Sequence, residues 1–253
     1  MPRPPENADT GPTVAPPAAD PARRRWIGRA AVLGGLVAVA PLAALADEED
    51  STDVLAVEDL MREHGVLRRA LLVYAQAAEQ LRHAQAIPAD ALHHTAELFR
   101  RFGEEYHERS LEEQHVFPAV IAAGGQPAAI CRTLAAQHRR GRQITDYLLA
   151  VSAGTAVGRS RMAALAGVLD GLVRMYQHHT AIEDTVVFPA WKRTLTPARY
   201  SALSEQFEAL EKRMFGHDGF EDAVQRIGAI EQAFGLADLA ALTAPAPPPA
   251  PAR

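Results

Sequence analysis

The sequence predicts an all-α protein, an up-down-up-down four-helix bundle with an additional C-terminal helical segment. Leucine and alanine dominate a composition that is 48% hydrophobic but only 6% aromatic. Such a composition favours helices over strands. Apolar residues also recur at helical spacing through the body of the chain, and the connectors between helical stretches are short and contain glycine. Short connectors make neighbouring helices antiparallel.

The first helical segment carries Leu60, Leu67 and Leu71 on one stripe, and Pro88 stops it. The second and fourth segments are expected to close at Phe-Pro pairs, because proline does not fit a helix interior. The later helices are expected at about 90–115, 127–151 and 161–187, with two further stretches in 196–235 that break at the glycines of 215–219.

Composition divides the chain into five parts. The Pro- and Ala-rich ends cannot bury enough apolar surface to order themselves. We therefore expect a disordered segment at 1–22, a signal or hydrophobic segment at 23–46, a linker at 47–56, the helical bundle at 57–236 and a Pro/Ala-rich tail at 237–253.

The N-terminal part has the layout of a secretory signal. Arg23-Arg24-Arg25-Trp26-Ile27 precedes a nearly uncharged run that ends in Ala44-Leu45-Ala46. The arginine pair followed by apolar residues resembles the twin-arginine type, whose machinery exports proteins already folded around their cofactors. We expect cleavage after Ala46 and a periplasmic protein. The alternative is an uncleaved N-terminal membrane anchor, although the apolar run 30–46 would reach only about 25 Å as a helix, against a hydrocarbon core of about 30 Å.

Charge and cysteine usage exclude several classes of function. The net charge of -5 is small and no basic stripe runs along the body of the chain, so nucleic acid is not an expected partner. Cys131 is the only cysteine, which excludes an intramolecular disulfide, a Cys-rich zinc site and a cysteine-ligated iron–sulfur cluster held by one chain. We expect Cys131 to pack in the core. Any metal site must therefore use nitrogen and oxygen ligands.

An internal duplication is the strongest signal in the chain. Glu112-x4-Phe117-Pro118 in the second helix recurs as Glu183-x4-Phe188-Pro189 in the fourth. With nearly the same offset, His64 in the first helix recurs as His138 in the third, and His107 recurs as His178. Each pair of helices thus carries one isolated histidine and a His-and-Glu group near a Phe-Pro pair.

Bundles bind pairs of metal ions by pointing imidazoles and carboxylates inward from facing helices. Four imidazoles with two carboxylates able to bridge suit a di-iron centre with open coordination positions, although other divalent metals can also use these ligands. The recurrence makes ligation by His64, His138, Glu112 and Glu183 the preferred interpretation over ordinary packed or solvated side chains.

Two ligand positions stay open at this stage. His179 precedes Glu183 by four residues, about 40° apart on an ideal helix, whereas His178 is five residues away and about 140° apart. Geometry favours His179. In the second helix the position four before Glu112 is Glu108, and His107 is five before it. Either His107 reaches the metal across a distorted turn, or Glu108 replaces an imidazole. We favour His107, with Glu108 as a candidate extra ligand. His115, three residues after Glu112, is the spare candidate.

With Glu63-His64, Gln137-His138 and the doubled His-Glu-Phe-Pro signature, the chain resembles the hemerythrin-like, or HHE cation-binding, family over about 57–236. The resemblance implies a four-helix bundle with a non-haem di-iron centre. Its ligands would be His64, His107, Glu112, His138, His178 or His179, and Glu183. The sequence departs from the pattern at Glu108, where many relatives have histidine, and at Arg142, where oxygen-carrying members have a second histidine.

The candidate ligands and the resemblance together suggest three functions. The leading one is an exported di-iron protein that binds a small diatomic ligand, oxygen or nitric oxide, or iron itself. The second is a di-iron oxidoreductase acting on peroxide or nitric oxide, or in iron-centre repair, with a nearby tyrosine or glutamate as proton donor. The third is a metal-free structural or partner-binding bundle. A membrane is expected as a partner only through an uncleaved N-terminal segment.

Overall fold

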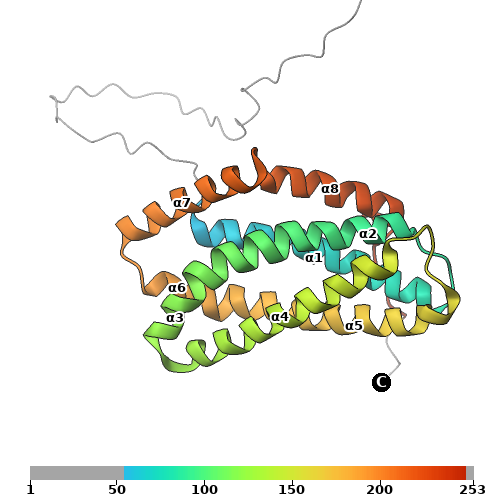
Figure 1. Ribbon diagram of the computed structural model, residues 1–253, viewed down its shortest axis with the longest axis horizontal. Coiled ribbons are helices and arrows are strands. Elements are labelled where there is room, and N and C mark those ends of the chain that lie inside the picture. Colours follow the sequence, from blue (N-terminus) through green and yellow to red (C-terminus); the bar gives the residue numbers. More distant parts are fainter. Residues whose placement is uncertain (1–53, 249–253) are drawn as a thin grey trace, which may run out of the picture. The chain divides into compact units, whose positions relative to one another are not determined.

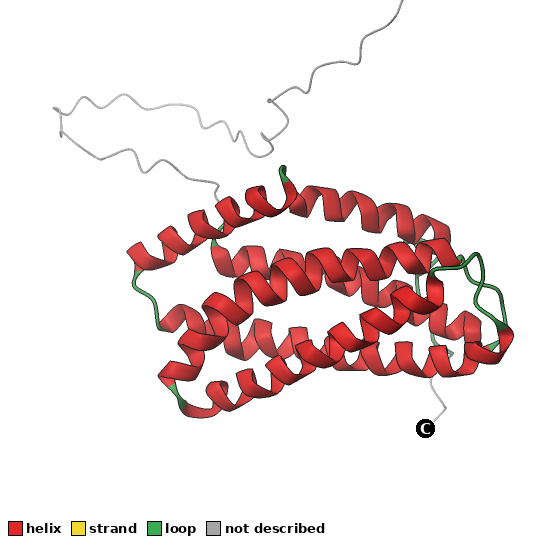
Figure 2. Ribbon diagram, viewed as in Figure 1, coloured by secondary structure: helices red, strands yellow, loops and turns green. Residues whose placement is uncertain are grey.

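The computed structural model describes residues 54–248, and every regular element within them is a helix (Figure 2). The predicted all-α class is confirmed. The N-terminal segments 1–22 and 23–46, most of the 47–56 linker and residues 249–253 lie outside the described residues. In the part of the chain that the structure describes, none of the helices combines the length and the apolar character needed to cross a membrane.

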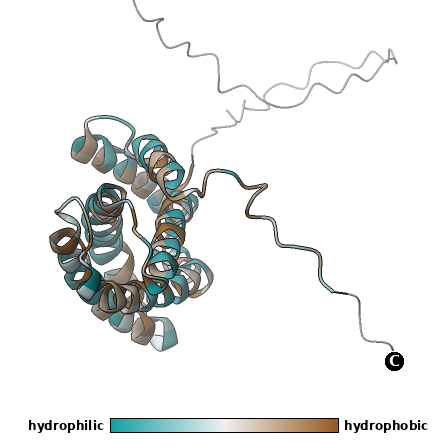
Figure 3. Ribbon diagram, turned by 90° about the vertical axis from the view of Figure 1, so that its right-hand side faces the viewer, coloured by the Kyte–Doolittle hydropathy of each residue, from teal (hydrophilic) through white to brown (hydrophobic). Residues whose placement is uncertain are grey.

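Four long helical rods form the core of the bundle (Figure 1). The first packs along the fourth and the second along the third. Viewed along their length in Figure 3, the rods surround a common interior. Their bounds are α1 (Ala56–Arg82); α2 (Ala89–Leu98), η2 (Phe99–Val116) and α3 (Phe117–Ala123) in one continuous rod; α4 (Gly125–Ser152); and α5 (Arg159–Ile182), η3 (Glu183–Val187) and α6 (Phe188–Arg193) in another.

The sequence pattern explains the packing of α1. Its apolar residues at three- and four-residue spacing, including Leu60, Leu67, Leu71 and Tyr74, are all buried. The predicted burial of Cys131 in α4 is confirmed. Hydrophobic burial on one stripe of each rod therefore fixes which faces meet in the interior.

The Phe-Pro pairs do not end the second and fourth rods, so that part of the prediction was wrong. The rods continue to Ala123 and Arg193 as α3 and α6. Each pair stands where a π-helical stretch, with hydrogen bonds between residues five apart, gives way to a new α-helix. The proline thus occupies the first turn of that helix, where its missing N–H leaves no hydrogen bond unmade. The chain turns instead at Gly124 and Gly125, whose φ angles of 79° and 73° favour glycine.

A C-terminal hairpin covers one side of the core (Figure 1). It consists of α7 (Pro197–Phe215) and α8 (Gly219–Phe234), which break at Gly216 in the left-handed conformation as the glycines there predict. Asp218 caps α8 by accepting a hydrogen bond from the Glu221 backbone N–H at 2.9 Å. Buried residues of α8 pack on α1 and α2.

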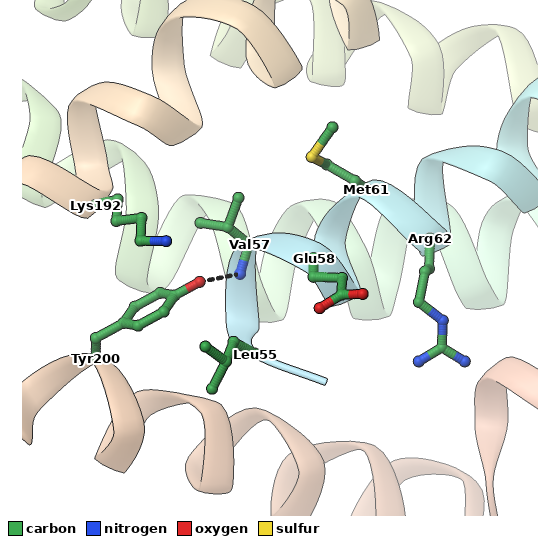
Figure 4. Close-up of a pocket in the computed structure, with 7 residues that line it drawn as sticks. All are labelled: Leu55, Val57, Glu58, Met61, Arg62, Lys192 and Tyr200. Carbon is green, nitrogen blue, oxygen red and sulfur yellow. Dashed lines mark hydrogen bonds between the residues drawn. The ribbon is translucent and has the colours of Figure 1, made fainter. Parts of the chain in front are cut away.

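The hairpin also completes the start of α1. The first N–H groups of a helix have no partner within it, and Leu55 at the N-cap of α1 offers no side-chain acceptor. Two hydroxyl groups of α7 take this role: Tyr200 Oη accepts from the Val57 N–H at 3.0 Å, and Ser204 Oγ accepts from the Ala56 N–H at 2.9 Å. Figure 4 shows Tyr200 reaching Val57 beside a surface hollow lined by Leu55, Val57, Glu58, Met61, Arg62, Lys192 and Tyr200. None of these residues was predicted as a ligand.

Candidate metal centre

Six of the eight predicted ligand residues meet in the interior, with contributions from all four rods. We call them the His/Glu cluster. Each side chain is at most 3% exposed, so the cluster is shielded from water. The members are His64 from α1, His107 and Glu112 from η2, His138 from α4, His179 from α5 and Glu183 from η3.

The two glutamates each face both halves of the cluster. Glu112 Oε1 lies 3.4 Å from His107 Nε2 and Glu112 Oε2 lies 3.3 Å from His138 Nε2. Glu183 Oε1 lies 3.0 Å from His179 Nε2, and its Oε2 lies 3.5 Å from His64 Nε2. Each carboxylate thus spans from one imidazole to another across the interior. A carboxylate placed in this way could hold a cation on either side.

The imidazoles form two pairs. In the first pair, His64 and His107, the Nε2 atoms are 3.0 Å apart; in the second pair, His138 and His179, they are also 3.0 Å apart. Ligand atoms of the second pair, Glu112 and Glu183 all lie within 4.8 Å of one another, as do those of the first pair with Glu112. The ligand atoms thus form two groups that share Glu112, and each group could hold a cation.

The carboxylate oxygens of the cluster are unpartnered. All four oxygens of Glu112 and Glu183 are buried and make no hydrogen bond, although imidazole nitrogens lie close by. Burying an ionised carboxylate without hydrogen bonds is costly, on the order of several kcal/mol per ion. Cations placed between the oxygens and the Nε2 atoms would offset this cost, so the residues present fit a metal centre.

Charge in the cluster is balanced by shifted protonation. Burial alone would lower the pKa of His107, yet the facing carboxylates, Glu112 first among them, raise it well above its usual value. Burial opposes protonation of His138 as well, but the surrounding glutamates raise its pKa to about 10. Burial would raise the pKa of Glu183, but the His179 and His64 imidazoles together outweigh it and hold that pKa well below the usual range. In the metal-free chain these shifts favour charged imidazoles, so a cation bound there would displace protons from them.

A second layer of side chains holds each imidazole by its other nitrogen. A histidine that donates from Nδ1 presents its Nε2 lone pair to a metal. The four Nδ1 acceptors are Asp184 for His64 at 2.7 Å, Glu63 for His107 at 2.5 Å, Glu113 for His138 at 2.9 Å and Gln137 for His179 at 2.9 Å. All four Nε2 atoms consequently point into the cluster.

None of these four acceptors was predicted as part of the site. Glu63 and Gln137 directly precede His64 and His138, while Glu113 and Asp184 directly follow Glu112 and Glu183. Residues adjacent on a helix do not share a face, which is why the pattern could not reveal these contacts. They form across the bundle rather than along one helix.

The π-helix decides which residue of the second rod enters the cluster. In η2 hydrogen bonds join residues five apart, as in the Phe117 N–H to Glu112 carbonyl bond that ends it. Residues five apart then share a face, and His107 lies beside Glu112 as a distorted turn would require. Glu108 turns away: its Oε1 accepts from Tyr176 Oη at 2.6 Å, and its Oε2 lies 3.4 Å from Arg142 Nη1.

Two further candidates lie outside the cluster. His178 is exposed, and its neighbour His179 takes the position that helical geometry favoured. His115 is half-buried and its ring packs 5.4 Å from that of Phe207. Metal ligation by the six cluster residues stays a prediction, since their convergence shows only that they can act together.

A helical bundle whose interior gathers histidines and carboxylates from every rod has the residues that a cation-binding protein needs. The chain belongs to the hemerythrin HHE cation binding domain family, which matches residues 55–191. The matched region holds the whole His/Glu cluster, whereas α7 and α8 follow it.

Proteins from Mycobacterium bovis and from two strains of Mycobacterium tuberculosis are similar to this chain. Each is 41% identical over 196 residues, which cover 77% of this chain and 76% of the relative, and each bears the name uncharacterized protein. No solved structure gives a significant match. Among these comparisons, only the family description therefore gives information about function.

Proposed function

We propose that the protein is an exported non-haem di-iron protein that binds a small diatomic ligand, oxygen or nitric oxide, or iron itself. The observation that carries this proposal is the pair of buried glutamates whose four unpartnered oxygens face four Nε2 atoms. Family membership supports cation binding. The number and identity of the ions belong to the proposal.

The count of donor atoms supports open coordination positions. Two octahedral ions need about a dozen donors, whereas the cluster offers four imidazole nitrogens and four carboxylate oxygens. The remaining positions would be free for water or a small ligand. Two iron ions would supply reversible electron transfer there, while the chain supplies a dry cavity and fixed imidazole orientations.

Selection of iron needs an explanation, because zinc and copper bind nitrogen-rich sites more tightly than ferrous iron. Folding around iron before export would avoid that competition. The twin-arginine-type pattern at 23–46 supports such a route. Replacing Arg23 and Arg24 with lysine should retain the protein in the cytoplasm, and continued export would contradict this part of the proposal.

One observation favours an enzyme as the second candidate. Tyr176 packs 5.3 Å from the His179 ring and donates to Glu108, so a hydroxyl and a carboxylate lie together beside the second pair. Such a pair could deliver a proton to a ligand bound nearby. The candidate reaction is reduction of peroxide or nitric oxide by a di-iron oxidoreductase.

Anaerobic reduction of the iron-loaded protein, followed by oxygen, separates the two candidates. A reversible optical change without oxygen consumption supports binding, whereas turnover with excess reductant supports catalysis. Tyr176→Phe provides the matched control, because it should leave reversible binding in place but lower turnover. Less than stoichiometric metal after iron-replete expression would instead favour a bundle that works without metal.

A further inference from the structure

The internal duplication extends to the contacts behind the imidazoles. His64 in α1 and His138 in α4 are each followed four residues later by an arginine. His64 Nδ1 donates to Asp184 at 2.7 Å, and Arg68 pairs with the same carboxylate. This contact ties the first rod to the residue that follows the bridging Glu183.

The third rod repeats this pattern. His138 Nδ1 donates to Glu113 at 2.9 Å, and Arg142 pairs with Glu113. Glu113 in turn follows the bridging Glu112. One histidine in each pair is therefore held by an acid that an arginine neutralises, and the two halves match at this point.

The two halves differ in the hydrogen-bond partners of the other two imidazoles, His107 and His179. His107 Nδ1 lies 2.5 Å from Glu63 Oε2, and Glu63 is only 1% exposed. His179 Nδ1 lies 2.9 Å from the side-chain oxygen of Gln137, which is neutral and half-buried. Glu63 and Gln137 occupy equivalent positions, each directly before a cluster histidine. The duplicated halves thus differ by one charge at one contact.

A further carboxylate adds negative charge beside the second pair, but it does so without a hydrogen bond to an imidazole. Glu108 lies on the side of the second pair, but its closest approach to an imidazole is 4.0 Å from His138 Nδ1. It accepts hydrogen bonds from Tyr176 and Arg142 rather than from a histidine. Only Glu63 adds a second charge-assisted hydrogen bond to an imidazole pair.

A carboxylate behind a metal-bound histidine raises the basicity of that ligand more than a neutral amide does. We infer that the two cation positions are inequivalent: the position at His64 and His107 binds its ion more tightly and fills first, because Glu63 stands where the other half has Gln137. The inference rests on the proposed function, since it requires that the cluster bind two ions.

The test is a titration of the metal-free full chain with cobalt(II) in competition with a chelating indicator, at constant neutral pH. It yields two stepwise dissociation constants. Repulsion between the ions separates the two steps even in identical sites, so the direction in which a substitution moves them is the informative result. Helical circular dichroism checks that each variant is folded.

Glu63→Gln and Gln137→Glu are matched, isosteric changes. Changes in second-layer contacts of this kind typically alter metal affinity about 10–100-fold. Glu63→Gln should weaken the tight step by about that factor and so bring the two steps together. Gln137→Glu should strengthen the weak step and also bring them together. The double swap should separate the steps again.

A larger ratio between the two stepwise dissociation constants in both single variants would overturn the inference. Two equivalent positions would behave in this way, because changing either one makes them unequal. Unchanged constants in both variants would overturn the inference as well. In either case the binding of two ions would leave the proposed di-metal function standing. Absence of cobalt binding by the folded wild-type chain would instead overturn the proposed function, and the inference with it.

Discussion

The second and fourth rods of the bundle reach the same cluster by different backbone paths. In the second rod His107 and Glu112 are five residues apart, and both lie within the 18-residue π-helix η2. In the fourth rod His179 and Glu183 are four residues apart, and the π-helical stretch η3 begins only at Glu183 and spans 5 residues. A wider helical coil absorbs the extra residue in the second rod. The comparison shows that ligand pairs separated by four or by five residues in the sequence can reach the same position in the bundle, provided that the helical coil differs.

Loss of a bridging carboxylate should have the largest effect, and it should be the same in both rods. Glu112→Gln removes the negative charge and one of the two donor oxygens, and Glu183→Ala removes the whole carboxylate, so each should lower bound metal to well below the wild-type amount per chain. Elemental analysis of purified protein measures this. Glu108→Gln is the control from the same π-helix, and it should keep the wild-type metal content. Equal loss in the Glu108 variant would place that carboxylate among the ligands.

Removing each of two neighbouring histidines in turn tests which of them faces the cluster in the fourth rod. The duplication aligns His107 with His178, whereas the structure buries His179 and leaves His178 exposed. His179→Ala should therefore weaken metal binding at least about 10-fold, and His178→Ala should leave it unchanged. A competition titration on both variants checks the prediction. A larger loss in the His178 variant would show that the duplication gives the true register.

A buried acid that only the second rod carries should make the stability of the protein depend on pH. Glu104 is fully buried in η2, at the position where the duplication puts Met175 in the fourth rod. Burial, opposed by the hydrogen bond from Thr145, raises the pKa of Glu104 to about 7. The folded chain therefore binds this proton more tightly than the unfolded chain, whose carboxyl has a pKa near its usual 4.5.

The cost of ionising Glu104 is consequently absent below about pH 4.5, grows as the pH rises and is complete above about pH 7. Glu104→Gln should remove it. The quantity to compare is the free energy of unfolding of the variant minus that of the wild type. This difference should be up to about 3 kcal/mol more favourable to the variant at pH 8 than at pH 4.5. Denaturant unfolding of both metal-free proteins at the two pH values measures this. A difference that does not change with pH would show that Glu104 is not strained by burial.

The smallest expected effect concerns the contact that draws Glu108 out of the cluster. A Cβ added at Gly141 would lie 2.0 Å from Tyr176 Oη, the group that donates to Glu108. Gly141→Ala should therefore destabilise the protein by about 1–3 kcal/mol. Gly171→Ala, in a helix position with nothing within 4 Å of the added atom, should stabilise by roughly 0.5–1 kcal/mol. Thermal unfolding compares the two, and stabilisation by both would show that Tyr176 moves without cost.

Helical periodicity and the duplication report on buried faces, so the sequence alone predicts the helical class, the C-terminal hairpin and eight candidate ligands, of which six converge. It favoured His107 but left Glu108 open, because an ideal α-helix puts Glu108, four residues before Glu112, on the face of Glu112, whereas the π-helix puts His107 there. The same backbone change explains why Pro118 and Pro189 failed as helix ends. The contacts of Glu63 and Gln137 arise from packing between rods, which spacing along one helix does not encode.

The signal at 23–46 and cleavage after Ala46 stay predictions, as these residues lie outside the described part of the chain. Their physical basis is charge and hydropathy alone. A protein that folds around its metal before export would need the whole cluster to form first. Export and metal loading are thus linked in the proposal.

Iron stoichiometry is the most direct test of the central claim, that two bridging glutamates from differently coiled rods hold two ions. Metal-free protein is loaded anaerobically with ferrous iron, excess iron is removed, and iron per chain is counted together with the absorption spectrum after oxidation. We predict two iron ions per chain and the charge-transfer bands of a bridged pair. One ion per chain or none, in a chain that retains its helical circular dichroism, would contradict the account.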